Sequence, residues 1–286
     1  MPLSEPAINL QLKEALLVSE SYTFARAKKW LGFLLGLQCF IFVTGVAAIF
    51  IPAATLSYPY IAFSIAALNT WVSQRVAQLK GAADDCKRKH ELYDGFGVAP
   101  SGKWLANFRL ANPGALKTAE ENLLRKGITY ASSELPGPRR ILENVVESSW
   151  FSHHLARWCA TALAWGIFIT GIFLVAVLFY LTSSTEQAES RDAAARAIAA
   201  TFLFVISLGM IRALLSYQGF SRKADKCDDD ATDLLNAAGE PADYDALRIL
   251  NDYQMARASA PMIPTWVWKI LRDRLNENWK IKKGEI

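Results

Sequence analysis

The chain has 286 residues, of which 52% are hydrophobic and 20% are charged, and its net charge is +4 at neutral pH. Soluble domains average about 45–50% apolar and about 25% charged residues, so composition alone excludes neither a soluble nor a membrane protein. The distribution is more informative, because the hydrophobic residues form long runs and Lys and Arg residues flank those runs. This pattern is typical of membrane proteins, and we expect no direct binding of nucleic acid.

Four segments are predicted to cross a membrane, because a helix of about 20 residues spans the hydrocarbon core. They cover residues 30–51, 58–76, 158–182 and 193–217. The first and third contain no charged residue, the second begins with interfacial aromatic residues, and the fourth carries an arginine near each end. Short connections join the first segment to the second and the third to the fourth. The sequence therefore predicts two transmembrane hairpins.

The orientation of these spans follows from the basic residues near their ends. Lys and Arg residues precede the first span and follow the second and fourth, whereas the hairpin loops, residues 52–57 and 183–192, have no such excess. The positive-inside rule puts both loops outside the cell and both termini in the cytoplasm. No secretory signal peptide is expected, because the first apolar run is too long and lacks a cleavage site.

The remaining segments are predicted to form a mainly helical cytoplasmic domain, which makes the chain an all-α membrane protein. This domain combines residues 1–29, 79–155 and 218–286, and the hairpins occupy residues 30–78 and 156–217. The helices of the second and fourth spans are expected to continue into it as stalks, because no Gly or Pro interrupts the segments that follow Gly81 and Gly219. Further helices are predicted at residues 105–110, 115–126, from Pro138 onward, 243–258 and 265–280. The apolar face of the helix that starts at Pro138 contains Ile141, Leu142, Val145, Val146 and Trp150. That of the last helix contains Val267, Ile270, Leu271 and Leu275.

Catalytic and metal-binding patterns are lacking, so neither an enzyme nor a cofactor is expected. The sequence has no phosphate-binding glycine loop, no GxSxG and no HExxH. Its four cysteines are not spaced for zinc, and the two in the cytoplasmic part, Cys86 and Cys227, are not expected to form disulfides. His90 and the acidic residues 228–230 are predicted to be solvated. A membrane enzyme would need His153, His154 and Glu147 at one interface, although an interfacial histidine pair that bonds head groups or water is the simpler explanation.

Small and polar residues in the first two spans suggest sites of helix packing or of a pore. Gly32 and Gly36 form a GxxxG pattern, which permits close approach of helices in an oligomer. Gln38 and Asn69 place polar groups at membrane depth, where they either bond across helices or line a pore. A transporter would need more such groups than these two.

A basic and aromatic set in the cytoplasmic part is the candidate ligand site. Arginine forks bind phosphate and aromatic rings stack on bases, so these residue types suit a nucleotide. The set comprises Arg139, Arg140, Tyr253, Arg257, Trp266, Trp268, Arg272 and Arg274. The alternative is that Arg139 and Arg140 contact lipid head groups and the tryptophans pack the domain.

Four stretches resemble the SMODS-associated four-transmembrane effectors of bacterial anti-phage systems. They are SYTFARAKKW, ELYDGFG, PRRILENVVESSWFSHHL and LRILNDYQMARASAPMIPTWVWKILRDRLNENW. The family's signature positions correspond to Tyr22, Lys28, Tyr93, Asp94, Glu147, Ser148, Phe151, Ser152, Arg248, Arg257, Pro264, Trp266 and Arg272. Two positions depart from the family pattern, since Phe is more usual at Tyr93 and Gln at Asn251.

The resemblance implies a multi-pass effector in the bacterial inner membrane. A neighbouring nucleotidyltransferase would make a cyclic oligonucleotide on infection, and this ligand would shift a homo-oligomer of the chain toward a state that permeabilises the membrane, in an abortive infection. A ligand shifts such an equilibrium only if it binds the active state more tightly than the resting state. The alternative is a membrane-anchored scaffold or partner-binding protein without a ligand-gated pore.

Overall fold

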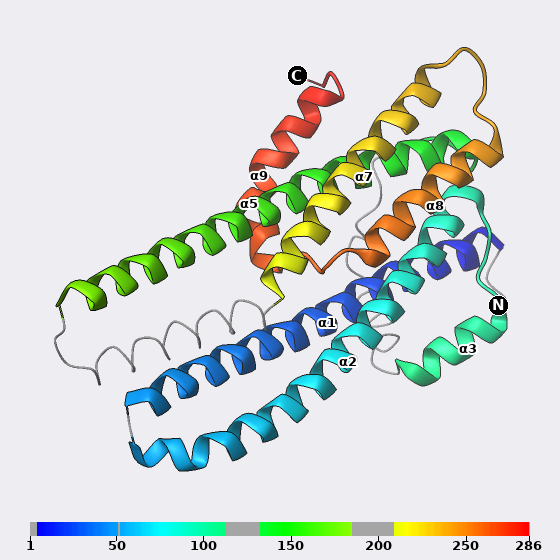
Figure 1. The fold of residues 1–286 in the computed structure, drawn as a ribbon. Helices are drawn as coiled ribbons and strands as arrows, with labels where there is room; N and C mark the ends of the chain where they lie inside the picture. Colours follow the sequence, from blue (N-terminus) through cyan, green and yellow to red (C-terminus); the bar gives the residue numbers. More distant parts are fainter. Residues whose placement is uncertain (1–4, 51, 113–131, 185–208, 286) are drawn as a thin grey trace. The chain divides into compact units, whose positions relative to one another are not determined.

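The computed structural model describes residues 5–50, 52–112, 132–184 and 209–285, and these ranges are helical with no strand (Figure 1). The helices are α1 (Glu5–Phe50), α2 (Pro52–Phe96), α3 (Gly102–Ala111), α5 (Pro138–Ser184), α7 (Met210–Asn236), α8 (Asp243–Ser259) and α9 (Thr265–Lys282). The prediction of an all-α protein is confirmed for the described residues.

The chain divides into two compact units. The first, here called the charged unit, comprises Met1–Lys28, Ala77–Ala156 and Gly219–Ile286. The second, the apolar unit, comprises Lys29–Val76 and Arg157–Gln218. These boundaries lie next to those that the apolar runs suggest. Helices α1, α2, α5 and α7 each contribute residues to both units.

Several helix boundaries match their sequence signals. Helix α5 begins at Pro138, where proline loses no helical hydrogen bond, and α9 follows Pro264 as its N-cap. Helix α2 continues to Phe96, as the stalk prediction requires. It begins at Pro52, so the predicted loop at residues 52–57 is wrong. Proline suits this first helical position too. The predicted helix 115–126 and most of the fourth span lie outside the described residues.

The charged unit has a core formed by several helices. Leu16 of α1, Cys86 and Tyr93 of α2 and Phe108 of α3 form one buried cluster. Further buried hydrophobic residues come from α5, α8 and α9, and they include Ile141, Leu142, Val145, Ile249, Leu250, Tyr253, Val267 and Leu275. The predicted apolar face of α9 is wrong at one position, because Ile270 is 62% exposed. The buried positions of α9 are eight residues apart, and Ile270 lies off that stripe.

The end of α2 packs closely against the start of α5 in this core. A Cβ added at Gly95 would lie 2.7 Å from Cδ1 of Ile141 and closer still to Cγ1, so only glycine fits there. The backbone N–H of Gly137 donates to the Gly95 carbonyl at 2.7 Å. Gly97, with φ of 71°, then ends α2 in the left-handed conformation that glycine favours.

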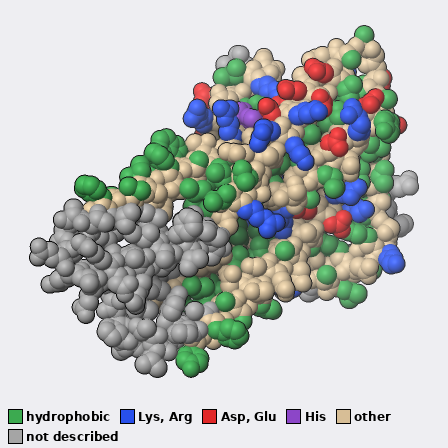
Figure 2. Space-filling view, in the orientation of Figure 1, with side chains coloured by type: hydrophobic (Ala, Val, Ile, Leu, Met, Phe, Trp, Pro, Cys, Tyr) green, Lys and Arg blue, Asp and Glu red, His purple; other side chains and the backbone are tan. Residues whose placement is uncertain are grey.

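The apolar unit exposes large hydrophobic side chains along its described helices. Examples from each helix are Phe40 (54%), Phe63 (78%), Phe168 (57%) and Phe179 (73%). On the face shown in Figure 2, charged side chains gather over α7, α8 and α9 of the charged unit. The described parts of α2 and α5 that belong to the apolar unit show hydrophobic side chains there. A soluble monomer rarely exposes an apolar surface of this extent.

One helix among the described residues is long and apolar enough to cross a membrane. It is the Pro138–Ile172 part of α5, whose most apolar window has a mean hydropathy of 1.4 and is 22% buried within the chain. By length and composition, therefore, the structure supports one membrane-spanning helix.

Candidate functional site

Charged residues follow one face of α2 at helical spacing. Lys80, Asp84, Lys87, Glu91 and Asp94 recur every three or four residues, so their side chains share one side of the helix. This side faces other helices of the charged unit rather than water, and Glu91 and Asp94 are buried. Ionised carboxylates at such positions require cationic partners.

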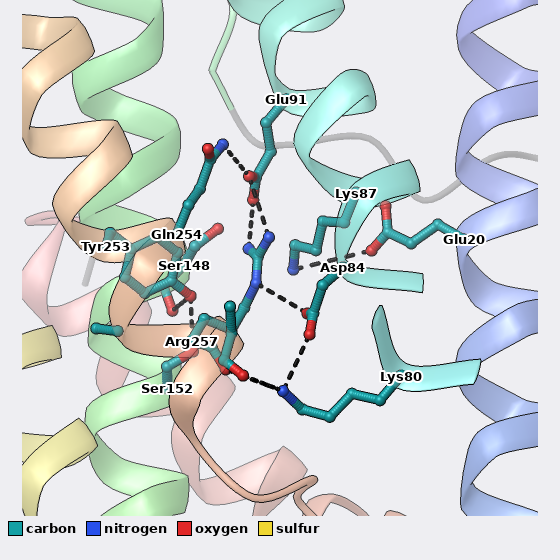
Figure 3. Close-up of polar contacts among 12 residues, drawn as sticks. Glu20, Lys80, Asp84, Lys87, Glu91, Ser148, Ser152, Tyr253, Gln254 and Arg257 are labelled. Carbon is teal, nitrogen blue, oxygen red and sulfur yellow. Dashed lines mark hydrogen bonds and ion pairs between the residues drawn. The ribbon is translucent and has the colours of Figure 1, made fainter. Parts of the chain in front are cut away.

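Glu91 finds its partner on α8, far away in sequence. Nη1 of Arg257 donates to Oε1 of Glu91 at 2.7 Å, and the Gln254 amide donates to Oε2 at 2.8 Å (Figure 3). Nε of Arg257 also lies 3.6 Å from Oδ1 of Asp84. Burial by itself would raise the pKa of Glu91, but Arg257 and Lys87 hold that pKa below its ordinary value.

Asp94 occupies a second buried pair one helical turn further along α2. Arg140 donates to both of its oxygens, at 2.9 and 3.2 Å, and the Asn144 amide donates at 2.8 Å. Lys13 of α1 also pairs with this carboxylate. Burial opposes ionisation, yet Arg140 and Lys13 lower the pKa of Asp94.

Tyr253 connects α8 to α5 in the interior of the charged unit. Its ring is 1% exposed, and its hydroxyl donates to the Ser148 carbonyl at 3.0 Å. The hydroxyl of Ser152 lies 2.8 Å from the Tyr253 hydroxyl oxygen. The Arg257 guanidinium lies 5.5 Å from the centre of the Tyr253 ring. Tyr253 and Arg257 thus serve as packing and pairing residues where these helices meet.

A cavity of about 490 Å³ opens beside this network, with residues of α1, α2, α5, α7, α8, α9 and the α8–α9 connection around it. Four basic side chains line it, against two carboxylates. The basic residues are Lys28, Lys80, Lys87 and Arg257, and the acidic ones are Glu20 and Asp84. The rest of the lining is mainly apolar and includes Phe24, Phe220 and Trp268. A volume of this order is usual for small-molecule sites.

The structure distributes the predicted ligand set over several places. Only Arg257 and Trp268 line the cavity. Arg140 is paired with Asp94, Tyr253 is buried, and Arg139 lies exposed near Glu143. Trp266, Arg272 and Arg274 have exposed side chains on α9, with Arg272 bonded to its neighbour Asp273. The structure therefore does not bring these residues together, because buried carboxylates and helix faces separate them, and their part in ligand binding stays a prediction.

The cavity also contains residues that were not predicted as ligand contacts. Lys28, Lys80 and Lys87 lie near the ends of predicted spans, where the positive-inside pattern already accounted for them. Lys28 of α1 and the two lysines of α2 line one cavity only after the chain has folded.

Two predictions of solvated residues are corrected. His90 is 2% exposed, and its Nδ1 lies 3.3 Å from Oε2 of Glu20. Asp228 is also buried and accepts hydrogen bonds from Lys282 of α9 at 2.6 and 2.7 Å. Burial raises the pKa of Asp228, and Lys282 offsets only part of this effect. In both cases another helix covers the face that the sequence presents as polar.

His153 and His154 make contacts with other side chains and backbone of the charged unit. Nδ1 of His153 lies 3.0 Å from the Ser221 carbonyl, and the His154 ring packs edge-on against Trp150 at 4.6 Å. Among the described residues, no group of three His, Cys, Asp or Glu side chains is placed to hold a metal ion.

The predicted packing or pore residues lie in the apolar unit. A Cβ at Gly32 or Gly36 would have no atom of the described chain within 4 Å. Their role in contacts between copies of the chain therefore stays a prediction. Gln38 is half-buried, and the buried Oδ1 of Asn69 accepts no hydrogen bond from the described residues.

Comparisons with known protein families, curated proteins and solved structures gave no match to this chain.

The two buried carboxylates predict an acid-sensitive charged unit. The pKa values of Glu91 and Asp94 lie below their values of about 4 in an unfolded chain, so unfolding takes up protons in acid. Their stabilisation is present above about pH 5 and is lost as the pH falls through the folded pKa values. We expect the thermal midpoint in detergent, measured by circular dichroism, to fall steeply below about pH 5.

The opposite sign at Asp228 provides a control for this prediction. Its raised pKa means that ionisation costs stability as the pH rises through the folded value, so Asp228→Asn should not reduce the acid sensitivity. A midpoint that stays constant between about pH 6 and 3 would contradict the assignment of buried ionised pairs.

Proposed function

We propose that the chain is a membrane effector of a bacterial anti-phage signalling system. The observation that carries the proposal is the division into two chemically different units. One exposes large apolar side chains and contains residues 157–172 of the described helix that can cross a membrane, and the other surrounds a cavity lined by four basic side chains. The apolar unit is the output in the inner membrane, and the charged unit is the cytoplasmic input.

The proposed topology has four spans in two hairpins, with both termini in the cytoplasm. The exposed apolar side chains of α1, α2 and α5 support the first three spans, since side chains of this type suit contact with lipid. The Lys and Arg residues near the ends of the apolar runs support the orientation. GxxxG contacts at Gly32 and Gly36 would join copies of the chain in a homo-oligomer.

The proposed signal is a cyclic nucleotide made by a neighbouring nucleotidyltransferase. The sequence resemblance suggests this ligand, and the basic and aromatic cavity supports an anionic ring compound. Binding must favour the conformation in which the membrane is permeable, because a ligand with equal affinity for both states would change nothing.

A dye-release assay tests this proposal directly. The purified full-length chain is placed in liposomes that contain a self-quenched dye, and cyclic di- and trinucleotides are added one at a time. We expect release with one of them and none with linear mononucleotides or buffer. Absence of release with every cyclic nucleotide, at all protein-to-lipid ratios, would refute ligand-gated permeabilisation.

A scaffold is the second candidate, and one surface favours it. Helix α8 exposes Tyr244 (75%), Leu247 (41%) and Met255 (62%), which are large side chains of the kind found in protein interfaces. Overproduction of the chain together with its neighbouring nucleotidyltransferase separates the two candidates. The effector arrests growth under phage infection, whereas a scaffold leaves growth unchanged.

A further inference from the structure

The basic side chains of the cavity differ in how far they are neutralised. Arg257 is bound to Glu91, which lies behind the cavity wall. Lys80 donates to the Ala258 carbonyl at the end of α8 at 2.5 Å and lies 3.0 Å from Asp84. These two residues hold α8 against α2, so their main role is to stabilise the walls of the cavity.

Lys28 and Lys87 are neutralised less completely than these two residues. Nζ of Lys87 lies 3.8 Å from Oε1 of Glu20, too far for a hydrogen bond, and the other oxygen of Glu20 lies near His90. Among the described residues, no carboxylate oxygen lies within 4.0 Å of Nζ of Lys28, the limit for an ion pair. Burial lowers the pKa of Lys28, and Lys87 lowers it further, so the two ammonium groups repel each other in a poorly solvated place.

From this geometry we infer that the cavity binds a phosphate ester, with Lys28 and Lys87 as the phosphate contacts. A phosphate group carries the charge to neutralise both amines at once, and an anion placed between them replaces repulsion by attraction. The inference names the input site of the proposed function and depends on that function only for the ligand's biological origin.

The apolar part of the lining indicates what the phosphate is attached to. Phe24, Phe220 and Trp268 line the same cavity as the lysines, and a free inorganic ion would leave these surfaces uncovered. Trp268 packs edge-on against Phe151 at 5.7 Å, which holds its indole in place. Aromatic rings beside cations are the combination that binds the base and the phosphate of a nucleotide.

Lysine acylation measures occupancy of this site without any membrane readout. The full-length chain in detergent is treated with acetic anhydride at about pH 8, and mass spectrometry follows the modification of each lysine. Pyrophosphate, adenosine monophosphate and cyclic di-AMP are tested separately against sodium chloride of equal ionic strength. We expect slower acylation of Lys28 and Lys87 with these phosphates, by about threefold or more, while the exposed Lys29 and Lys223 are unaffected.

Substitutions then separate a site from a general charge effect. Lys87→Gln should raise the pyrophosphate concentration that half-protects Lys28 by about tenfold or more, the usual loss for a charge-assisted hydrogen bond. Lys29→Gln, one residue along α1 from Lys28, should change it by less than about twofold. Equal acylation of Lys28 with and without all three phosphates, or equal effects of both substitutions, would overturn the inference.

Two further comparisons identify the source of the phosphate and separate a failure of the binding site from a failure of the proposed function. Protection of Lys28 in phosphatidylglycerol nanodiscs but not in phosphatidylcholine nanodiscs identifies a lipid head group, whereas equal reactivity in both identifies a free ester. Protection without dye release supports the site and refutes the proposed function. Dye release that Lys28→Gln and Lys87→Gln leave unchanged refutes the site and supports the function.

Discussion

Replacement of Glu91 by leucine is expected to destabilise the charged unit by roughly 3–5 kcal/mol, the usual result when one member of a buried ion pair is removed. The substitution leaves the Arg257 guanidinium and the Gln254 amide without the acceptor that both now share. For a domain of about this size, the thermal midpoint should fall by roughly 5–15 °C. Tryptophan fluorescence during thermal unfolding in detergent gives the measurement.

A double variant shows whether the loss comes from the orphaned charge. Glu91→Leu combined with Arg257→Met replaces the pair by apolar side chains of similar length, and such exchanges are often neutral in buried sites. Asp84 keeps Lys80 as its partner at 3.0 Å. We expect the double variant to unfold at a higher temperature than either single one. Arg272→Ala, at an exposed pair, should change stability by less than about 0.5 kcal/mol. A double variant less stable than both singles would contradict this explanation.

Gly95→Ala is the second substitution with a large expected effect. The new Cβ would overlap the Ile141 side chain, which is 1% exposed and has no room to withdraw. We expect a loss of about 1–3 kcal/mol from overpacking, with the value toward the upper end because the overlapped atom is near the Ile141 backbone. Chemical denaturation in detergent provides the readout.

The same helix contains a matched control for this glycine. A Cβ at Gly81 has no described atom within 4 Å, so Gly81→Ala should stabilise α2 by about 0.5–1 kcal/mol. Ile141→Ala removes both overlapping atoms and leaves Cβ at 3.6 Å from the new methyl group. Gly95→Ala should therefore cost little more in an Ile141→Ala background. A similar cost in both backgrounds would show that the overlap is not the cause.

Local signals in the sequence predicted the helices of the charged unit well. Pro138 and Pro264 mark where α5 and α9 begin, and the apolar positions of α8 and α5 recur at helical spacing. These features depend only on neighbouring residues, which is why a single sequence reveals them. The start of α2 at Pro52 was missed because the short uncharged stretch before Tyr58, which begins with proline, separates two apolar runs as a loop does.

The candidate site was predicted poorly because its contacts are long-range. Glu91 and Arg257 are 166 residues apart, and nothing local distinguishes a carboxylate that will be buried from one that will be solvated. The charged face of α2 lies in a segment that was predicted as a stalk, and Lys28 lies next to the first predicted span. Trp266, Arg272 and Arg274 are close in sequence, but the turn of α9 exposes them away from the cavity.

The Glu91–Arg257 pair can form only late in synthesis, because Arg257 is made long after Glu91. At a synthesis rate of about 5–20 residues per second, Glu91 waits roughly 8–30 s for a partner that is 166 residues downstream. Because the charged unit is assembled from three separate stretches of chain, a product cut short before residue 257 lacks α9 and leaves this carboxylate without its arginine. Such a product also lacks Trp268, so part of the cavity lining is missing from it.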